Sequence, residues 1–380
     1  MQGSLKIARV MGIQIAVHFS WFAIFALVTW TLSAVYFPTR YPAWSPQTAW
    51  YAGVLTSVLF FASVLAHELA HSVVARRLGL EVESITLFVF GGMASIVREA
   101  ERPRHEFAIA FVGPLSSLGL GLGFALAGLI AERAAAMEVA GAVAWWLATI
   151  NVMLALFNLV PGFPMDGGRV LRSLLWGATR NFWLATRIAA TAGLVVAYLL
   201  MLGGLFLAVT GAFFNAAWVI LVGWFLSNSA HASYRQAKVR ESLRGVTVGQ
   251  AMTRDCQTVS PHLSLGEAFE NYFRPQRLAA IPVVADDSRI LGLLTHDNLK
   301  RVPMEYWDVT PVTEVMTGLA DTQTVTPQDE VNEVLSALGG KDFEETPVVE
   351  GGHFVGLLTR RDVLDLLRGR GQRGRRGAET

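Results

Sequence analysis

Long apolar stretches without charged residues dominate the first 231 residues of the chain. About 20 apolar residues cross a hydrocarbon core of roughly 30 Å, and five charge-free runs reach that length. The run after Arg187 holds 47 residues, so Gly211 and Asn215 near its middle are expected to form a turn between two helices. The pattern predicts six transmembrane helices, near residues 13–36, 50–76, 107–131, 139–160, 187–210 and 213–231.

A segment of different character separates the second and third predicted helices. Residues 81–90, EVESITLFVF, are rich in β-branched and aromatic side chains and end at Gly91-Gly92. This composition predicts a strand, and with it a small membrane-associated β element. Two roles remain open for residues 85–90, a short surface hairpin and an edge strand that faces a substrate.

The chain after residue 245 contains an internal repeat. Three blocks recur at an offset of 64 or 65 residues: VGQAMT (248–253) with VTEVMT (312–317), IPVV (281–284) with TPVV (346–349), and GLLT (292–295) with GLLT (356–359). Each unit reads as strand, helix, strand, strand, helix. A period of this length indicates a duplicated α/β domain and argues against a solenoid.

These patterns divide the chain into four parts. We expect a six-helix membrane domain over residues 1–231, a linker over 232–244, and a tandem module over 245–367 with repeats at about 246–304 and 310–367. Residues 368–380 hold arginines among glycines, with too few apolar residues to fold, and are expected to form a basic disordered tail.

Composition and charge agree with this division. Asp, Glu, Lys and Arg supply 22 of the first 231 residues but 39 of the remaining 149, and ten of the 11 Trp lie in the first part, where indole rings suit membrane interfaces. A net charge of +1 excludes a chain built around nucleic-acid binding, so we expect no nucleic-acid partner. The single cysteine, Cys256, excludes an internal disulfide framework and a Cys-rich metal cluster.

The positions of Lys and Arg predict the orientation in the membrane. If the N-terminus lies inside, the inner loops carry 14 of these residues and the outer loops carry only Arg40 and Arg133. Positively charged loops stay in the cytoplasm. We therefore expect a multi-pass protein of the cell membrane, with its N-terminus and its tandem module in the cytoplasm.

Three ionisable side chains lie within one turn of the second predicted helix. His67 and His71 are four residues apart and share a helix face, so both imidazoles can bind one zinc ion, with Glu68 beside them as general base. Charges within a membrane are costly unless they face a polar interior. The alternative is a pair of histidines satisfied by hydrogen bonds in a helix bundle.

A third metal ligand is expected from the end of the fourth predicted helix. Residues 158–168, NLVPGFPMDGG, contain two prolines and three glycines that break the helix. Irregular backbone at membrane depth is tolerated only where protein or a water-filled cavity surrounds it. Catalytic zinc usually takes three protein ligands, and Asp166 is the leading candidate for the third. Without the two histidines, Asp166 would be interpreted as a turn-forming residue at a membrane boundary.

These residues resemble the site-2 protease family of intramembrane zinc metalloproteases. The resemblance covers residues 1 to about 231. It rests on HELAH (67–71) with Ala75 and Gly79, on Asn158, Pro161, Pro164 and DGG (166–168), and on GPLSS (113–117) and Gly92.

The resemblance implies roles for individual residues. His67, His71 and Asp166 would hold one zinc ion per chain, and Glu68 would activate the attacking water. Asn158 would hold the substrate backbone or the developing oxyanion. The implied activity is regulated intramembrane proteolysis, the zinc-dependent hydrolysis of a peptide bond in a transmembrane substrate helix. His18 is a candidate for a substrate gate or an accessory metal contact, although a satisfied interior histidine is the favoured interpretation.

The repeat resembles the CBS domain, two copies of which pack as one module. The pattern Gly-x-x-Thr-x-x-Asp, which contacts adenosine phosphates in that family, falls on Thr359 and Asp362 in the second repeat. In the first repeat it falls on Thr295 and Asn298, where Asn replaces Asp. The resemblance implies an adenine nucleotide as ligand and a homodimer formed through the module. A CBS pair that binds no nucleotide and only mediates dimerisation is the alternative.

Two functions follow for the whole chain. The first is an intramembrane metalloprotease modulated by its cytoplasmic CBS pair through adenine nucleotide. The second is a CBS-regulated membrane transporter or channel, which is expected to show inverted repeats and paired broken helices. Residues 1–231 show no such symmetry, so the sequence favours the protease.

Overall fold

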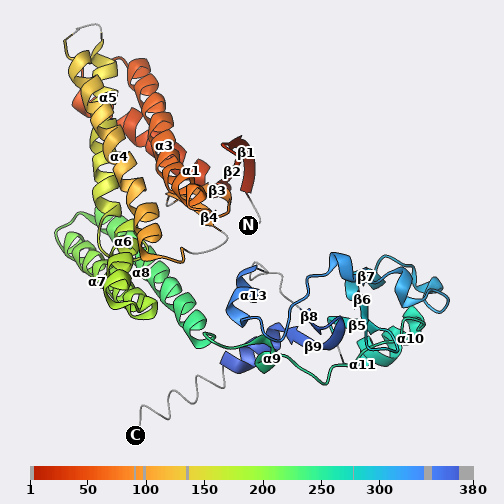
Figure 1. The fold of residues 1–380 in the computed structure, drawn as a ribbon. Coiled ribbons are helices and arrows are strands. Elements are labelled where there is room, and N and C mark those ends of the chain that lie inside the picture. The colour runs from red at the N-terminus through yellow and green to blue at the C-terminus, as the bar shows by residue number, and fades with distance from the viewer. Residues whose placement is uncertain are drawn as a thin grey trace. The chain divides into compact units, whose positions relative to one another are not determined.

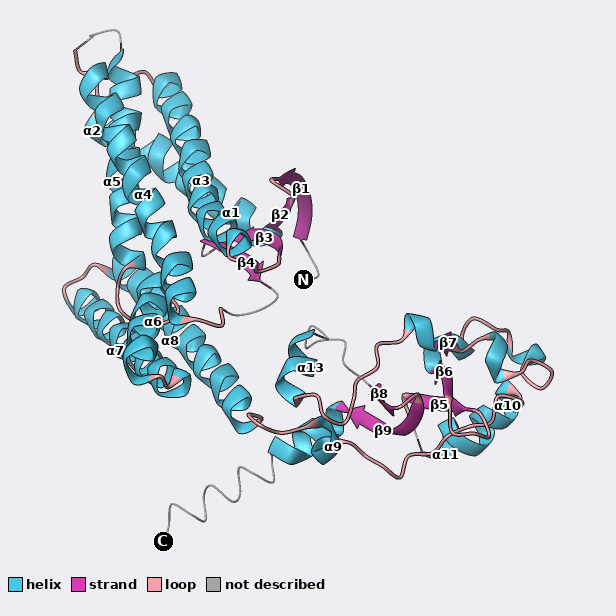
Figure 2. Ribbon diagram, viewed as in Figure 1, coloured by secondary structure: helices cyan, strands magenta, loops and turns pink. Residues whose placement is uncertain are grey.

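The computed structural model describes residues 4–89, 91–96, 100–133, 137–276, 278–337 and 345–367 (Figures 1 and 2). It divides into two compact units, Met1–Ala237 and Lys238–Thr380. The basic tail predicted for residues 368–380 lies outside the described residues.

Helices build most of the first unit. They are α1 (Phe19–Thr31), a π-helical turn (Leu32–Tyr36), α2 (Phe37–Arg40), α3 (Pro46–Arg77), α4 (Pro103–Ala131), α5 (Glu138–Asn158), α6 (Asp166–Thr179), α7 (Phe182–Val209) and α8 (Phe213–Ser242). Among the described residues, six segments are long and apolar enough to cross a membrane: Phe19–Arg40, α3, α4, α5, α7 and α8. This confirms the predicted helical membrane domain with six spans.

Two boundaries differ from the sequence prediction. Residues Ile13–His18 form strand β2 and not the start of the first helix. The turn before β2 holds Gly12 at a φ of +81°, where Arg76 from the end of α3 packs against it. At the other end of the domain, α8 continues to Ser242 through most of the segment predicted as a linker. The predicted linker is therefore largely helical.

A four-stranded sheet lies beside the helices of the first unit. Its order is β1 (Ser4–Val10), β2, β3 (Val82–Phe88) and β4 (Gly91–Ile96). β3 pairs with β4 as an antiparallel hairpin and with β2 in parallel. A hairpin is therefore confirmed at residues 85–88, but it is not a surface one, because Ile85 and Leu87 are buried. The edge-strand interpretation is wrong, because β2 covers the other side of β3 and leaves β4 at the edge.

The second unit shows the duplication directly. β5 (Ala280–Val284), β6 (Ile290–Thr295) and β7 (Thr317–Gly318) form one sheet, and β8 (Glu345–Glu350) and β9 (His353–Thr359) form another. Leu293 of β6 pairs with Thr317 of the second repeat, and Leu357 of β9 pairs with Thr253 of the first. Each repeat thus lends a short segment to the sheet of the other.

Short helices complete the second unit, and its apolar side chains form two cores. Among the described residues its α-helices are α9 (Val248–Ala251), α10 (Leu265–Ala268), α11 (Arg274–Gln276), α12 (His296–Leu299), α13 (Val331–Ala337) and one at residues 360–367, and a π-helical turn (Phe269–Phe273) joins α10 to α11. One core joins Val248 to Val348 and Leu358, and the other joins Val312 to Ile281 and Leu294. Both cores mix side chains from the two repeats.

Candidate metal centre

Three ligand atoms from two helices converge inside the membrane domain. The Nε2 atoms of His67 and His71 on α3 lie 3.2 Å apart. Each lies 3.1 Å from Oδ2 of Asp166, the first residue of α6. Both histidines are buried. The structure therefore brings the three predicted ligands together across 95 residues of sequence or more.

The arrangement fits a zinc ion. Bonds of about 2.0–2.1 Å to a tetrahedral ion place neighbouring ligand atoms about 3.3 Å apart, close to the observed triangle. A Cβ atom built on Gly113 of α4 would lie 2.1 Å from Nε2 of His71 and 2.8 Å from Nε2 of His67. The absence of a side chain at Gly113 therefore leaves room for an ion at the point where the ligands meet.

Helix α4 orients both histidines from one face. Nδ1 of His71 donates to the carbonyl oxygen of Ile109 at 2.6 Å. Because a carbonyl only accepts, Nε2 of the neutral ring carries the lone pair that a metal needs. Nδ1 of His67 lies 2.9 Å from the hydroxyl oxygen of Ser117, which is fully buried. Ile109, Gly113 and Ser117 are spaced by four residues and so line one stripe of α4.

Ile109 and Ser117 were not predicted from the sequence as partners of the histidines. Gly113 and Ser117 were noted only as the ends of the segment GPLSS (113–117). Gly113 and Ser117 have the same four-residue spacing as His67 and His71, and this spacing could have indicated that the two helix faces meet. The identity of Ile109 gave no such signal, because it acts through its backbone carbonyl.

Close backbone packing fixes the position of Asp166. A Cβ on Gly168 would lie 2.4 Å from the carbonyl carbon of Gly162 and 2.5 Å from the backbone nitrogen of Phe163. Only glycine allows the preceding turn to lie this close to α6. The backbone N–H of Phe163 also donates to the carbonyl oxygen of Ala189 on α7, at 3.1 Å. The turn is therefore held between α6 and α7.

Glu68 lies between the ligand group and the edge of the sheet. A Cβ on Gly92 of β4 would lie 2.3 Å from Cγ of Glu68, so the backbone of β4 runs directly against this side chain. The ionisable groups around Glu68 include His67, His71, Asp166 and Arg169. A carboxylate suited to proton transfer and an edge strand are thus adjacent.

Two other candidate residues have hydrogen bonds close to their own positions in the chain. Asn158, the last residue of α5, donates from Nδ2 to the carbonyl oxygen of Leu154 at 3.0 Å. His18 caps α1, because its Nδ1 accepts the backbone N–H of Ser20 at 3.2 Å. Ser20 in turn accepts the backbone N–H of Val89 through its hydroxyl oxygen. This agrees with the favoured interpretation of His18 as a satisfied interior histidine.

The four candidate nucleotide contacts form two equivalent helix caps. Asn298 Oδ1 accepts from the backbone N–H and the hydroxyl of Thr295, each at 2.8 Å. Asp362 Oδ2 accepts from the same two groups of Thr359, at 2.9 and 2.7 Å.

The same two residues also bond to the opposite repeat. Asn298 Nδ2 donates to the hydroxyl oxygen of Thr317 at 3.2 Å, and the hydroxyl of Thr253 donates to Oδ1 of Asp362 at 2.7 Å. Asn298 is only 1% exposed, whereas Asp362 is half-buried. Asp362 is therefore the more accessible of the two to a ligand.

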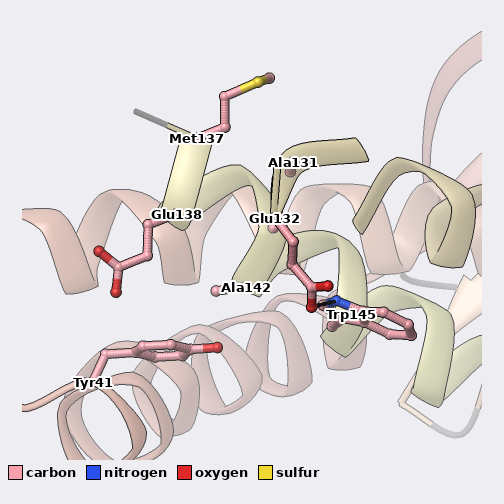
Figure 3. Close-up of a pocket in the computed structure, with 8 residues that line it drawn as sticks. Tyr41, Ala131, Glu132, Met137, Glu138, Ala142 and Trp145 are labelled. Carbon is pink, nitrogen blue, oxygen red and sulfur yellow. Dashed lines mark hydrogen bonds between the residues drawn. The ribbon is translucent and has the colours of Figure 1, made fainter. Parts of the chain in front are cut away.

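A separate pocket of about 430 Å³ lies at the other end of α4. Figure 3 shows the Glu132 carboxylate beside the indole nitrogen of Trp145, which donates to it at 2.7 Å, with Glu138 and Tyr41 nearby. Ala131 in its lining follows Gly113 by 18 residues on α4, which is about 27 Å of helix. This pocket is therefore distinct from the metal centre.

Comparison with known proteins identifies both parts of the chain. The family model for peptidase family M50 matches residues 55–133 and 126–203, and the CBS domain model matches residues 248–305 and 312–369. Rip3 of Mycobacterium tuberculosis is 35% identical over 97% of this chain and 93% of its own length. The protein sll0528 of Synechocystis is 36% identical over 97% of this chain and 96% of its own length.

The solved structures similar to this chain include a site-2 protease. The site-2 protease from Methanocaldococcus jannaschii is 26% identical, covers 61% of this chain and 95% of its own, and aligns with a TM-score of 0.43.

Proposed function

The chain belongs to peptidase family M50, the site-2 type of intramembrane zinc metalloprotease, and we propose that His67, His71 and Asp166 hold its zinc while Glu68 is its general base. The enzyme is a multi-pass membrane protein with a C-terminal CBS pair. The observation that carries the proposal is the triangle of ligand atoms, with sides of 3.1–3.2 Å, whose histidines are both oriented by α4.

The reaction divides between the ion and the side chains around it. Zinc, when bound, supplies a Lewis acid that polarises the scissile carbonyl and lowers the pKa of water. Glu68 accepts a proton from the attacking water on its carboxylate and returns it to the leaving amide nitrogen. Asn158 holds the substrate backbone or the developing oxyanion, after its amide releases the carbonyl oxygen of Leu154.

The substrate is a transmembrane protein whose helix unwinds locally before cleavage, because a hydrogen-bonded helix hides its peptide carbonyls. Strand β4 is the edge of the sheet that lies against Glu68. An unwound segment paired with β4 would gain backbone hydrogen bonds beside the base. This supports capture of substrate at β4, in place of the role first considered for residues 85–90.

The cytoplasmic CBS pair is the proposed regulator. The excess of Lys and Arg in the inner loops supports a cytoplasmic N-terminus and CBS pair. α8 extends from the last span to Ser242, and Leu243, the next residue, is fully buried in a CBS core. The chain therefore enters the CBS core directly after α8 ends. Adenine nucleotide bound near Thr359 and Asp362, and a homodimer formed through the module, complete the proposal.

Glu68→Gln tests the proposed chemistry. The variant keeps the three ligands, so the purified protein should retain zinc while cleavage of a membrane substrate falls by at least about 10²-fold. The matched control is Glu132→Gln, which removes a carboxylate from the distant pocket and should leave cleavage near the wild-type rate. Near-normal cleavage by Glu68→Gln would show that another group activates the water.

A further inference from the structure

A buried ion pair joins α4 to α6 outside the ligand group. Nε of Arg172 on α6 donates to Oε1 of Glu106 on α4 at 2.7 Å, and a second guanidinium nitrogen bonds to the same oxygen. Glu106 is 1% exposed and Arg172 is 9% exposed. The pair is therefore removed from solvent. The strength of a buried Arg–carboxylate contact depends strongly on its geometry.

Glu106 shares a face of α4 with the residues that orient the histidines. The positions 106, 109, 113 and 117 follow at steps of three, four and four residues, which keeps them on one stripe. Along this stripe α4 contacts His71 through Ile109 and His67 through Ser117. The same stripe reaches Arg172 through Glu106. One helix face thus touches both the element that carries the histidines and the element that carries Asp166.

Arg172 also holds the chain on both sides of Asp166. It lies six residues after Asp166 on α6, about 9 Å along the helix axis. Its guanidinium carbon lies 5.0 Å from the ring centre of Phe163, in the turn before Asp166, and 4.7 Å from that of Phe182, at the start of α7. Contacts of this kind between a cation and aromatic rings are attractive and strengthen when water is excluded.

Stability alone does not account for this pair. Replacing a buried ion pair with apolar side chains of similar volume is often neutral or stabilising, because desolvation offsets the attraction. Fixing one arrangement among several is the best-supported reason to keep such a pair. Here the pair fixes the register of α6 against α4. Because Asp166 is the first residue of α6, that register also sets the position of this ligand.

We propose that Glu106 and Arg172 are positioning residues that set Asp166 against His67 and His71 and so raise the affinity for zinc. This inference rests on the proposed function, because it concerns the same metal centre. Neither residue contacts substrate or the reacting atoms. Their action is exerted through α6, and its measurable consequences are zinc affinity and the geometry of the ligands.

The test uses the full-length protein in detergent, with zinc affinity measured by competition against a chromophoric chelator. Absorption of the cobalt(II)-substituted protein reports ligand geometry independently of activity. Glu106→Gln keeps the side-chain shape and removes the charge. The double variant Glu106→Leu with Arg172→Met removes both charges and keeps the volume. Arg187→Gln, at an exposed position on α7, is the control for loss of an arginine.

Both Glu106→Gln and the double variant should lose zinc affinity by at least about tenfold, the size of effect found for partners of metal ligands, and should shift the cobalt absorption. Arg187→Gln should match the wild type in both. If Glu106→Gln does not fold, the zinc affinity and cobalt absorption of the double variant test the proposal, because that variant leaves neither charge of the pair buried. A folded variant with wild-type affinity and spectrum would overturn the proposal, and a wild-type protein that takes up no zinc would remove the proposed function as well.

Discussion

Polar side chains in the metal centre and in the CBS caps are engaged in opposite ways. In the metal centre, Nδ1–H of His71 donates a hydrogen bond to the carbonyl oxygen of Ile109, so its Nε2 lone pair faces Nε2 of His67 and a carboxylate oxygen of Asp166. In the second CBS repeat, Asp362 accepts from both the backbone and the hydroxyl of Thr359, and from Thr253 of the other repeat.

The difference shows how strongly the geometry of each site indicates a bound ligand, a metal in the first case and a nucleotide in the second. Acceptor atoms that converge in a buried site are well placed to share a cation, so the geometry of the first group suits a metal. A helix cap is complete when its hydrogen bonds are made. The caps of the CBS pair are therefore compatible with a nucleotide but do not require one.

The largest effect is expected when a ligand is removed. His67→Ala should lose most of the zinc, and cleavage should fall by at least about 10³-fold, because two remaining ligands hold the ion weakly. His18→Ala is the matched control, because it removes a histidine that caps α1. Elemental analysis should find close to one zinc per chain in this control. Equal zinc in the two variants would contradict the ligand assignment.

The sequence predicted the metal ligands, because their assignment depends on side-chain identity and on regular spacing. His67, His71 and Asp166 were selected by helical spacing and by a broken helix, and the structure brings their atoms within 4.8 Å of one another. Strand β2 was missed because Ile13, Ile15 and Val17 alternate inside a longer apolar run that also suits a transmembrane helix. Without β2, β3 looked like an edge.

Contacts between elements far apart in the chain could not be predicted from the sequence either. The carbonyl oxygen of Ile109 carries no side-chain signature, and the pairing of Glu106 with Arg172 spans 66 residues of sequence. Both contacts depend on how α4 packs against α3 and α6. A single sequence does not specify that packing.

A second effect should follow when the space at the metal is filled. A Cβ on Gly113 would lie 2.1 Å from Nε2 of His71, whose ring is held by Ile109. Gly113→Ala should therefore reduce zinc affinity by about 10²-fold. Gly119 on the same helix has open space around it, so Gly119→Ala should bind zinc as the wild type does. If the two alanine variants bind zinc equally, the space beside Gly113 is not where the ion binds.

A smaller effect is expected from the hydroxyl that orients His67. Ser117→Ala removes the partner of Nδ1 and should lower zinc affinity by about tenfold. Ser116→Ala is the control, because the Ser116 hydroxyl donates to the carbonyl oxygen of Gly113 within its own helix. Competition with a chelator measures both. An affinity unchanged by Ser117→Ala would mean that packing alone orients His67.

The smallest effect is expected in the CBS pair, where the caps are complete without a ligand. Asp362 is half-buried, whereas Asn298 is only 1% exposed. A carboxylate also offers two acceptor oxygens to ribose hydroxyls where an amide offers one. Asp362→Ala should therefore weaken adenine-nucleotide binding more than Asn298→Ala, and should leave zinc content unchanged. Loss of either cap costs about 1 kcal/mol of stability, so thermal unfolding of both variants provides the control. Calorimetry on the full-length protein that detects no ATP, ADP or AMP binding would leave dimerisation as the role of the module.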